Sequence, residues 1–179
     1  MRCFIAIDLP EEVKVEIIKV QRQIPLDNLK LKFVEKENLH LTLKFLGELE
    51  DFRIQKIKEK LKEISFHSFK VKLANTGIFP SESFIRVIWI GVNPDEKVLQ
   101  LQKEIDEKLL EIGFRKEKQF SAHVTIARVK FVEDKIALIK NMKAIKIKPI
   151  EFSINSFKLK KSILSKQGHI YGDVLEFKI

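Results

Sequence analysis

The chain has 179 residues, is 45% hydrophobic and carries a formal net charge of +9 at pH 7. This length and apolar content fit one domain or two small fused lobes, and they exclude a disordered chain. The basic excess favours a polyanionic partner such as nucleic acid, although many lysines adjoin glutamates on expected helix faces.

Cys3 is the single cysteine, which excludes an intrachain disulfide and a zinc cluster built on thiolates. It lies in an apolar run and is expected to be a buried strand residue. The N-terminus lacks the apolar region of a signal peptide, and no apolar stretch approaches the ~18 residues of a membrane span. We therefore expect a cytoplasmic protein without membrane contact. Abundant Lys, Glu and Ile hint at a thermophilic source.

Hydrophobic periodicity predicts alternating strands and helices in the first half of the chain. In chain order we expect a strand at 3–8, a helix from Pro10 to about Gln23, strands at 31–34 and 39–46 ended by Gly47, a helix at 51–64, and strands at 67–79 and 83–92 joined by a turn at Pro80-Ser81-Glu82.

The second half repeats this order. In chain order we expect a helix from Asn93 to Gly113, a strand at 121–129, a short helix at about 133–141, and strand-like alternation over 145–178 with a turn near Gly168. The pattern predicts two consecutive copies of one α+β unit, and the two halves meet near residue 93. We expect a single bilobal domain over 1–179. Its two pseudo-symmetric antiparallel sheets would have helices on their outer faces and a central groove between them.

Two His-x-Thr triplets stand out, His40-Leu41-Thr42 and His123-Val124-Thr125. With four histidines and three threonines in the chain, roughly 0.07 such triplets are expected by chance. One such strand alone is most often an ordinary amphipathic strand. Two in matching apolar contexts indicate a paired site.

Strand geometry explains the spacing, because side chains two positions apart point to the same face. Each strand therefore presents one imidazole and one hydroxyl, and a pseudo-twofold axis would let the two pairs face one another across a groove. One histidine can act as a general base on water while the other protonates a leaving oxygen. The threonine hydroxyls can donate to a phosphoryl oxygen.

Neither motif contains a carboxylate, so an oxygen-rich Mg²⁺ site is not supplied locally, and two histidines with two threonines would bind zinc poorly. We therefore expect neither a metal nor another cofactor. Cleavage of a strained cyclic phosphodiester fits these groups best.

Five segments together resemble the two-histidine (2H) phosphoesterase superfamily, and within it the RNA 2′,3′-cyclic phosphodiesterases, historically called 2′-5′ RNA ligases. The resemblance covers nearly the whole chain. It rests on residues 4–10, 38–47, 86–92, 120–128 and a looser closing element with Ser162, Ile163, Leu164, Gly168 and Tyr171. Departures occur at Ser121, Ala122 and Ser165, where the family often has His, Pro and Pro. None of them removes a catalytic group.

The resemblance implies a bilobal fold and hydrolysis of a terminal RNA 2′,3′-cyclic phosphate to a 2′-phosphomonoester. It implies that His40 is the proton donor, that His123 is the proton acceptor, and that Thr42 and Thr125 hold the phosphate. Sequence symmetry alone does not assign donor and acceptor. The implied partners are RNA 3′ ends with a cyclic phosphate, tRNA fragments among them, and we expect a monomer.

Arg128 and Phe4 are the candidate substrate-binding residues. The family pattern places an arginine near the nucleotide, but strand alternation puts Arg128 on the face away from the groove unless the strand bends, and a structural ion pair is the alternative. Phe4 could stack on a base or pack in the core.

Other polar residues are expected to be structural. They are Arg86 before a core strand, His67 on a strand surface, His169 in a turn, and the basic stretch Lys158, Lys160 and Lys161, which could guide RNA or belong to a solvated edge strand.

Three alternatives remain open from the sequence. In the first, the same residues would catalyse the reverse reaction, which is 2′-5′ RNA ligation. The chain could also be an RNA-binding module without turnover, or a helper protein without a nucleic-acid ligand.

Overall fold

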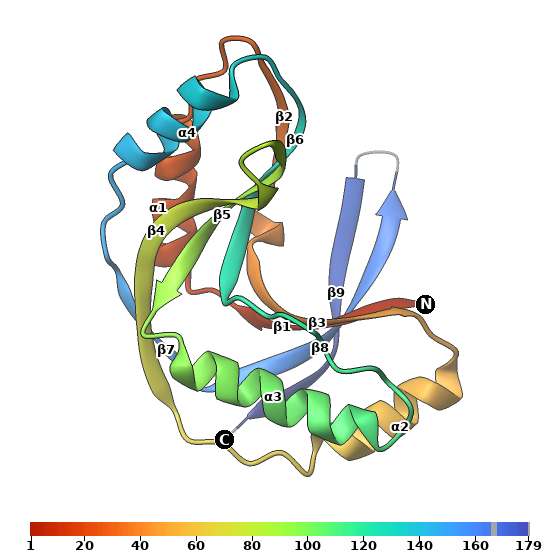
Figure 1. Ribbon diagram of the computed structural model, residues 1–179. Helices are drawn as coiled ribbons and strands as arrows, with labels where there is room; N and C mark the ends of the chain where they lie inside the picture. Colours follow the sequence, from red (N-terminus) through yellow and green to blue (C-terminus); the bar gives the residue numbers. More distant parts are fainter. Residues whose placement is uncertain (166–167, 179) are drawn as a thin grey trace.

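The computed structural model describes residues 1–165 and 168–178. Strands, helices and one 3-10 turn alternate along the chain (Figure 1). They are β1 (Arg2–Asp8), α1 (Glu11–Arg22), β2 (Leu29–Phe33), η1 (Lys36–Asn38), β3 (His40–Glu48), α2 (Asp51–Leu61), β4 (Phe69–Ser81), β5 (Phe84–Asn93), α3 (Glu96–Leu110), β6 (His123–Val132), α4 (Lys135–Ala144), β7 (Glu151–Ile154), β8 (Ser156–Ser165) and β9 (Gly168–Lys178).

The described strands form one curled sheet in the order β7-β4-β5-β6-β3-β1-β8-β9, with β2 paired to β6. The strand pairs are antiparallel, and the sheet is continuous between β6 and β3 through the pair Leu41–Val124. We call β3, β1, β8 and β9 the His40 lobe, and β6, β5, β4, β7 and β2 the His123 lobe. The α+β class and bilobal form are confirmed, and the two expected sheets are continuous at this junction.

Helices cover the outer faces of both lobes (Figure 1). Helix α1 leaves the His40 lobe with β1 and packs against β6, while α3 follows β5 and packs against β3. Each lobe therefore combines elements from both halves of the chain. The pseudo-repeat with a boundary near residue 93 stays a prediction.

The helices form because their apolar residues recur on one face. In α1 the buried apolar residues Val13, Ile17 and Val20 share that face, and the hydrophilic residues Glu16 and Gln21 are buried with them. Strand β1 is buried from Cys3 to Ile7 because it lies between β3 and β8. The expected burial of Cys3 is confirmed.

The predicted elements match the observed ones except in detail. Strand β3 runs through Gly47, whose positive φ of 76° lets the chain continue to Glu48. Helix α3 ends at Leu110, and Gly113 takes the left-handed φ of 88° expected just beyond a helix. The alternating tail is three strands, and part of the turn predicted near Gly168 falls on residues 166–167, outside the described residues.

Candidate active site

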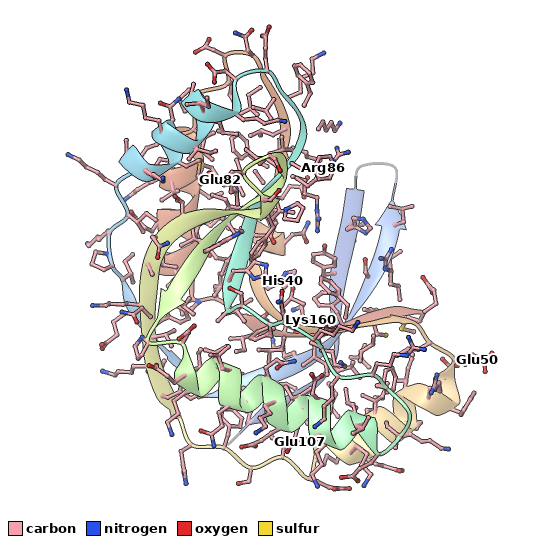
Figure 2. All side chains as sticks on the ribbon, viewed as in Figure 1. His40, Glu50, Glu82, Arg86, Glu107 and Lys160 are labelled. Carbon is pink, nitrogen blue, oxygen red and sulfur yellow. The ribbon has the colours of Figure 1, made fainter. Side chains whose placement is uncertain are left out.

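His40 and His123 begin strands β3 and β6 at the point where the two lobes join. Their neighbours Leu41 and Val124 are the paired residues of the junction, so the two His-x-Thr motifs lie side by side and run in opposite directions. Leu41 and Val124 are fully buried, as strand alternation requires. Figure 2 shows His40 near the centre of the molecule, between the two lobes.

A hollow of about 590 Å³ opens over this junction, and we call it the main groove. Its lining includes both motif histidines and both motif threonines, which the sequence predicted would face one another. These are His40, Thr42, His123 and Thr125. The structure therefore brings together the four residues singled out by the sequence.

The two imidazoles are held in the same way. Nδ1 of His40 lies 2.7 Å from the carbonyl oxygen of Asn38, and Nδ1 of His123 lies 2.7 Å from the carbonyl oxygen of Ser121. A carbonyl oxygen only accepts, so Nδ1 donates in both rings and Nε2 is the nitrogen left for proton transfer. Each histidine thus takes its orientation from the backbone two residues before it.

Aromatic rings surround each imidazole. The ring of His40 lies 4.9 Å from that of Phe4 and 5.2 Å from that of Tyr171. The ring of His123 lies 5.0 Å from that of Phe79 and 6.0 Å from that of Trp89. These rings limit the motion of the imidazoles and remove water from them.

Burial lowers the pKa of both histidines because it penalises the charged imidazolium. For His40 the pKa falls to about 4, with the Asn38 carbonyl opposing the fall and the charge of Lys160 adding to it. For His123 burial also lowers the pKa, and the Ser121 carbonyl opposes this. Both rings are therefore neutral at pH 7 when no anion is bound.

Arg128 faces the main groove, because β6 contains a β-bulge. Thr125 pairs with Trp89 and Ala127 pairs with Ile88, so Ile126 is the extra residue. Ile126 and Ala127 are both buried, and the alternation resumes with Arg128 exposed and lining the groove. The strand bends as the sequence argument required. Among the described residues, no carboxylate forms an ion pair with Arg128.

Phe45 is a groove residue that the sequence argument missed. Strand β3 has a matching bulge, since Thr42 pairs with Ala6 and Lys44 pairs with Ile5, which leaves Leu43 as the extra residue. The bulge turns Phe45 into the groove with 66% of its surface exposed. Phe45 thus occupies in the His40 lobe the position that Arg128 occupies in the His123 lobe.

Phe4 is only 3% exposed and lies between His40, Phe45 and Tyr171. This burial favours packing under His40 over stacking on a base, and its substrate contact stays a prediction. Arg86 stacks its guanidinium over Phe84 at 4.6 Å, and it does not line the groove.

The basic tail residues differ from the expectation of a solvated edge strand. Strand β8 lies between β1 and β9, and Lys158 and Lys160 each contact both Asp8 and Asp173 at 2.6–2.8 Å. Burial alone would raise the pKa of Asp8, but hydrogen bonds from the two lysines hold it below its usual range. These lysines are neutralised locally and are not free to bind RNA. Figure 2 shows Lys160 close to His40.

His169 also differs from its prediction as a turn residue. It lies in β9, lines the main groove, and its Nδ1 is 3.0 Å from Oγ of Ser162. The groove wall further includes Arg2 and Lys32. Nζ of Lys32 lies 3.4 Å from Oε1 of Glu35.

A second hollow of about 550 Å³, the side hollow, adjoins the main groove. The two share Thr42, Phe45, Phe79 and His123 in their linings, whereas His40 lines only the main groove. The side hollow is further lined by Leu43, Lys44, Glu117, Gln119, Phe120 and Ser121.

The LigT-like phosphoesterase family model matches the chain twice, at residues 7–89 and 90–171. The chain belongs to this family. The resemblance drawn from the sequence is confirmed, and with it the expectation of a hydrolase. Each match of the family model contains one His-x-Thr strand.

Relatives of this LigT-like phosphoesterase cover its full length. A protein of Methanocaldococcus jannaschii named RNA 2′,3′-cyclic phosphodiesterase is 44% identical over 99% of this chain and 100% of its own. One of Archaeoglobus fulgidus with the same name is 35% identical over 99% of both chains. The prediction of a thermophilic source agrees with the sources of some relatives.

Solved structures agree with the fold of this LigT-like phosphoesterase. A protein of Thermus thermophilus superposes with a TM-score of 0.83 at 26% identity, covering 99% of this chain and 97% of its own. Escherichia coli LigT complexed with 3′-AMP gives a TM-score of 0.80 at 25% identity, with the same coverage of both chains.

Two further structural facts bear on partners and metals. None of the helices within residues 1–165 and 168–178 combines the length and apolarity that a membrane span needs. Within the same residues, no three or more His, Cys, Asp or Glu side chains are grouped as metal ligands. Cytoplasmic location and a monomeric state stay predictions.

Proposed function

We propose that this LigT-like phosphoesterase hydrolyses the terminal 2′,3′-cyclic phosphate of RNA to a 2′-phosphomonoester without a metal ion, by acid/base catalysis between His40 and His123. The observation that carries the proposal is the matched pair of imidazoles, each fixed through Nδ1 at the lobe junction with Nε2 left for proton transfer. The names of the full-length relatives support the substrate, and the E. coli LigT complex with 3′-AMP supports a nucleotide in the groove.

In the proposed reaction, His123 takes a proton from water as the water oxygen bonds to phosphorus. The bond from phosphorus to O3′ breaks, and His40 gives its proton to O3′. The product keeps the phosphate on O2′. Thr42 and Thr125 donate hydrogen bonds to the non-bridging oxygens, where charge develops.

The donor role of His40 requires the bound phosphate. With a pKa of about 4, His40 is neutral in the empty site at pH 7. An anionic phosphate beside the ring favours the imidazolium and raises this pKa. Protonation of the donor is therefore coupled to substrate binding.

The groove also fits an RNA 3′ end. Arg2 and Arg128 bring positive charge to its wall, and Phe45 offers an exposed aromatic face on which a base can stack. The physiological RNA, tRNA fragments included, would be bound mainly by its 3′-terminal nucleotides.

The test is hydrolysis of an oligonucleotide ending in 2′,3′-cyclic phosphate, in EDTA, by the wild type, His40→Asn and His123→Asn. We expect wild-type turnover in EDTA, a 2′-phosphate product, and a loss of about 10²- to 10⁴-fold in each variant with an unchanged circular dichroism spectrum. Full activity in either variant, or wild-type activity that EDTA abolishes, would contradict the proposal. Turnover would also exclude the RNA-binding module without catalysis.

The side hollow favours 2′-5′ ligation as a second candidate activity. It borders His123 but not His40, and its aromatic lining could hold a nucleoside whose 5′-hydroxyl replaces water as the nucleophile. The bond from O5′ to phosphorus would form as the bond to O3′ breaks, with the same two proton transfers. Joining of cut RNA halves through a 2′-5′ linkage would support this activity, and hydrolysis alone would count against it.

A further inference from the structure

A buried ion pair links strand β3, just beyond its His-x-Thr motif, to helix α3. Nζ of Lys44 lies 2.6 Å from Oδ1 of Asp106, and these side chains are only 2% and 5% exposed. Lys44 is two residues beyond Thr42 in β3, and Asp106 is on the face of α3 that covers this strand. Charged groups are rarely buried so completely, because desolvation costs both ions hydration energy.

The pair also holds the segment that leads to His123. Nζ of Lys44 donates to the carbonyl oxygen of Arg115 at 2.8 Å, and the backbone N–H of Glu117 donates to Oδ2 of Asp106 at 2.8 Å. Residues 114–122 contain neither helix nor strand. Figure 1 shows this segment running from the end of α3 back to β6.

This segment ends at the groups that orient His123. Ser121 supplies the carbonyl that accepts from Nδ1 of His123, four residues after Glu117. The equivalent segment before His40 is held differently. It forms η1, and the Asn38 side chain donates to a carboxylate oxygen of Glu35 and to the carbonyl oxygen of His169, each at 3.0 Å.

The opposite lobe uses an uncharged contact at the matching place. In α1, Gln21 donates through Nε2 to the carbonyl oxygens of Val34 and Ile126, both at 2.9 Å, and so holds the bulge of β6. An uncharged side chain is thus sufficient to hold a bulge. Lys44 and Asp106 differ from Gln21 in that they also bind the backbone of the segment before β6, at Arg115 and Glu117.

We propose that the Lys44–Asp106 ion pair is a positioning device for His123, which anchors residues 115–117 so that the Ser121 carbonyl keeps the imidazole in its Nδ1–H tautomer. Lys44 and Asp106 are positioning residues that act through Ser121. The proposal rests on the proposed function for its kinetic consequence, but its structural consequence can be measured without turnover.

The test uses the double variant Lys44→Met/Asp106→Asn, which removes both charges together and so leaves no single buried charge. The double variant Lys44→Gln/Asp106→Asn, which also leaves no single buried charge, is the second variant in case the first fails to fold. Glu16→Gln is the matched control. Glu16 is a buried carboxylate of α1 that accepts from the backbone N–H of Lys148 at 3.0 Å, far from both motifs in the sequence.

¹⁵N NMR of the histidine rings and steady-state kinetics are the two measurements. In the wild type and in Glu16→Gln, we expect His40 and His123 to be Nδ1–H tautomers. In the folded double variant, we expect His123 to shift toward the Nε2–H tautomer while His40 is unchanged. We expect kcat to fall by about 10- to 100-fold with a much smaller change in KM, because the His123 imidazole loses its orientation while the substrate contacts remain.

An unchanged His123 tautomer and kcat in a folded variant would overturn the proposal. So would a fall in kcat that only follows the unfolded fraction, or an equal fall in Glu16→Gln. If the wild type itself fails to hydrolyse the cyclic phosphate, the proposed function is wrong, and the tautomer of His123 still decides whether the ion pair positions it.

Discussion

Leu41 of β3 and Val124 of β6 form the antiparallel pair at which the sheets of the two lobes become continuous, and each is the middle residue of a His-x-Thr motif. The pair fixes the register of the two motifs, because an antiparallel pair sets the positions of the residues on both sides of it. His40 and His123 therefore share one hollow without a side-chain contact between them. A slip of one residue in either strand would turn the histidine and the threonine of that strand away from the groove.

The pH dependence of catalysis follows from the lowered pKa values. His123 must be neutral and His40 protonated for the proposed reaction, so both profiles should be bell-shaped. The kcat/KM profile reports the free enzyme, where burial lowers both pKa values, and we expect its optimum below pH 6.5. The kcat profile reports the complex, and its optimum should lie at higher pH because the phosphate anion raises both values. Rates that stay flat from pH 5 to 9 would exclude the paired roles.

The stability of the fold should also depend on His40. Its folded pKa of about 4 is below the ordinary value of 6.5, so the unfolded chain binds the proton more tightly. The contribution of neutral His40 to the stability of the fold is therefore present above pH 6.5 and is lost as the pH falls toward 4. We expect the free energy of unfolding of the wild type to fall by about 2 kcal/mol more than that of His40→Asn between pH 7 and pH 5. Equal losses in urea titrations of the two proteins would show that His40 is not responsible.

Strand alternation predicted the shared face of each histidine and threonine, since it depends only on local geometry. It failed beyond Thr42 and Thr125, because the bulges at Leu43 and Ile126 shift the alternation by one residue. A bulge depends on pairing with a neighbouring strand, and neither extra residue differs from an ordinary core residue. Phe45 was missed for this reason.

The ion pairs of strand β8 show a second limit of prediction from the sequence. Lys158 and Lys160 form a basic stretch in the chain, but their partner Asp8 is about 150 residues away and becomes adjacent only because β8 pairs with β1. Local charge patterns therefore overstated the free positive charge of this segment. The family resemblance supplied the RNA substrate and the direction of proton transfer, and it carried no information about this ion-pair network.

Arg128 should contribute to RNA affinity through its charge. We expect Arg128→Gln to weaken binding of a single-stranded RNA and to reduce the slope of log K against log salt by about 0.7, which corresponds to one lost phosphate contact. Lys130→Gln is the matched control, because Lys130 is exposed on the same strand but does not line the main groove. Equal slopes for Arg128→Gln and the wild type would place Arg128 outside the phosphate contacts.

Gly77 should be required for the packing of Trp89 beside His123. A Cβ atom at Gly77 would lie 2.0 Å from Cζ2 of the Trp89 ring, so Gly77→Ala must displace the indole. We expect Gly77→Ala to lower stability by about 1–3 kcal/mol, the usual cost of overpacking. Because Trp89 is the single tryptophan of the chain, its fluorescence should change as the ring moves.

Gly91→Ala provides the matched comparison for Gly77→Ala. Gly91 lies on the neighbouring strand β5, and its Cβ would meet the same indole at 3.4 Å, close to an ordinary contact. We expect a much smaller change in Tm and in fluorescence. If the two alanine variants unfold at the same temperature with the same emission, the close approach of Gly77 to Trp89 does not limit the packing around His123.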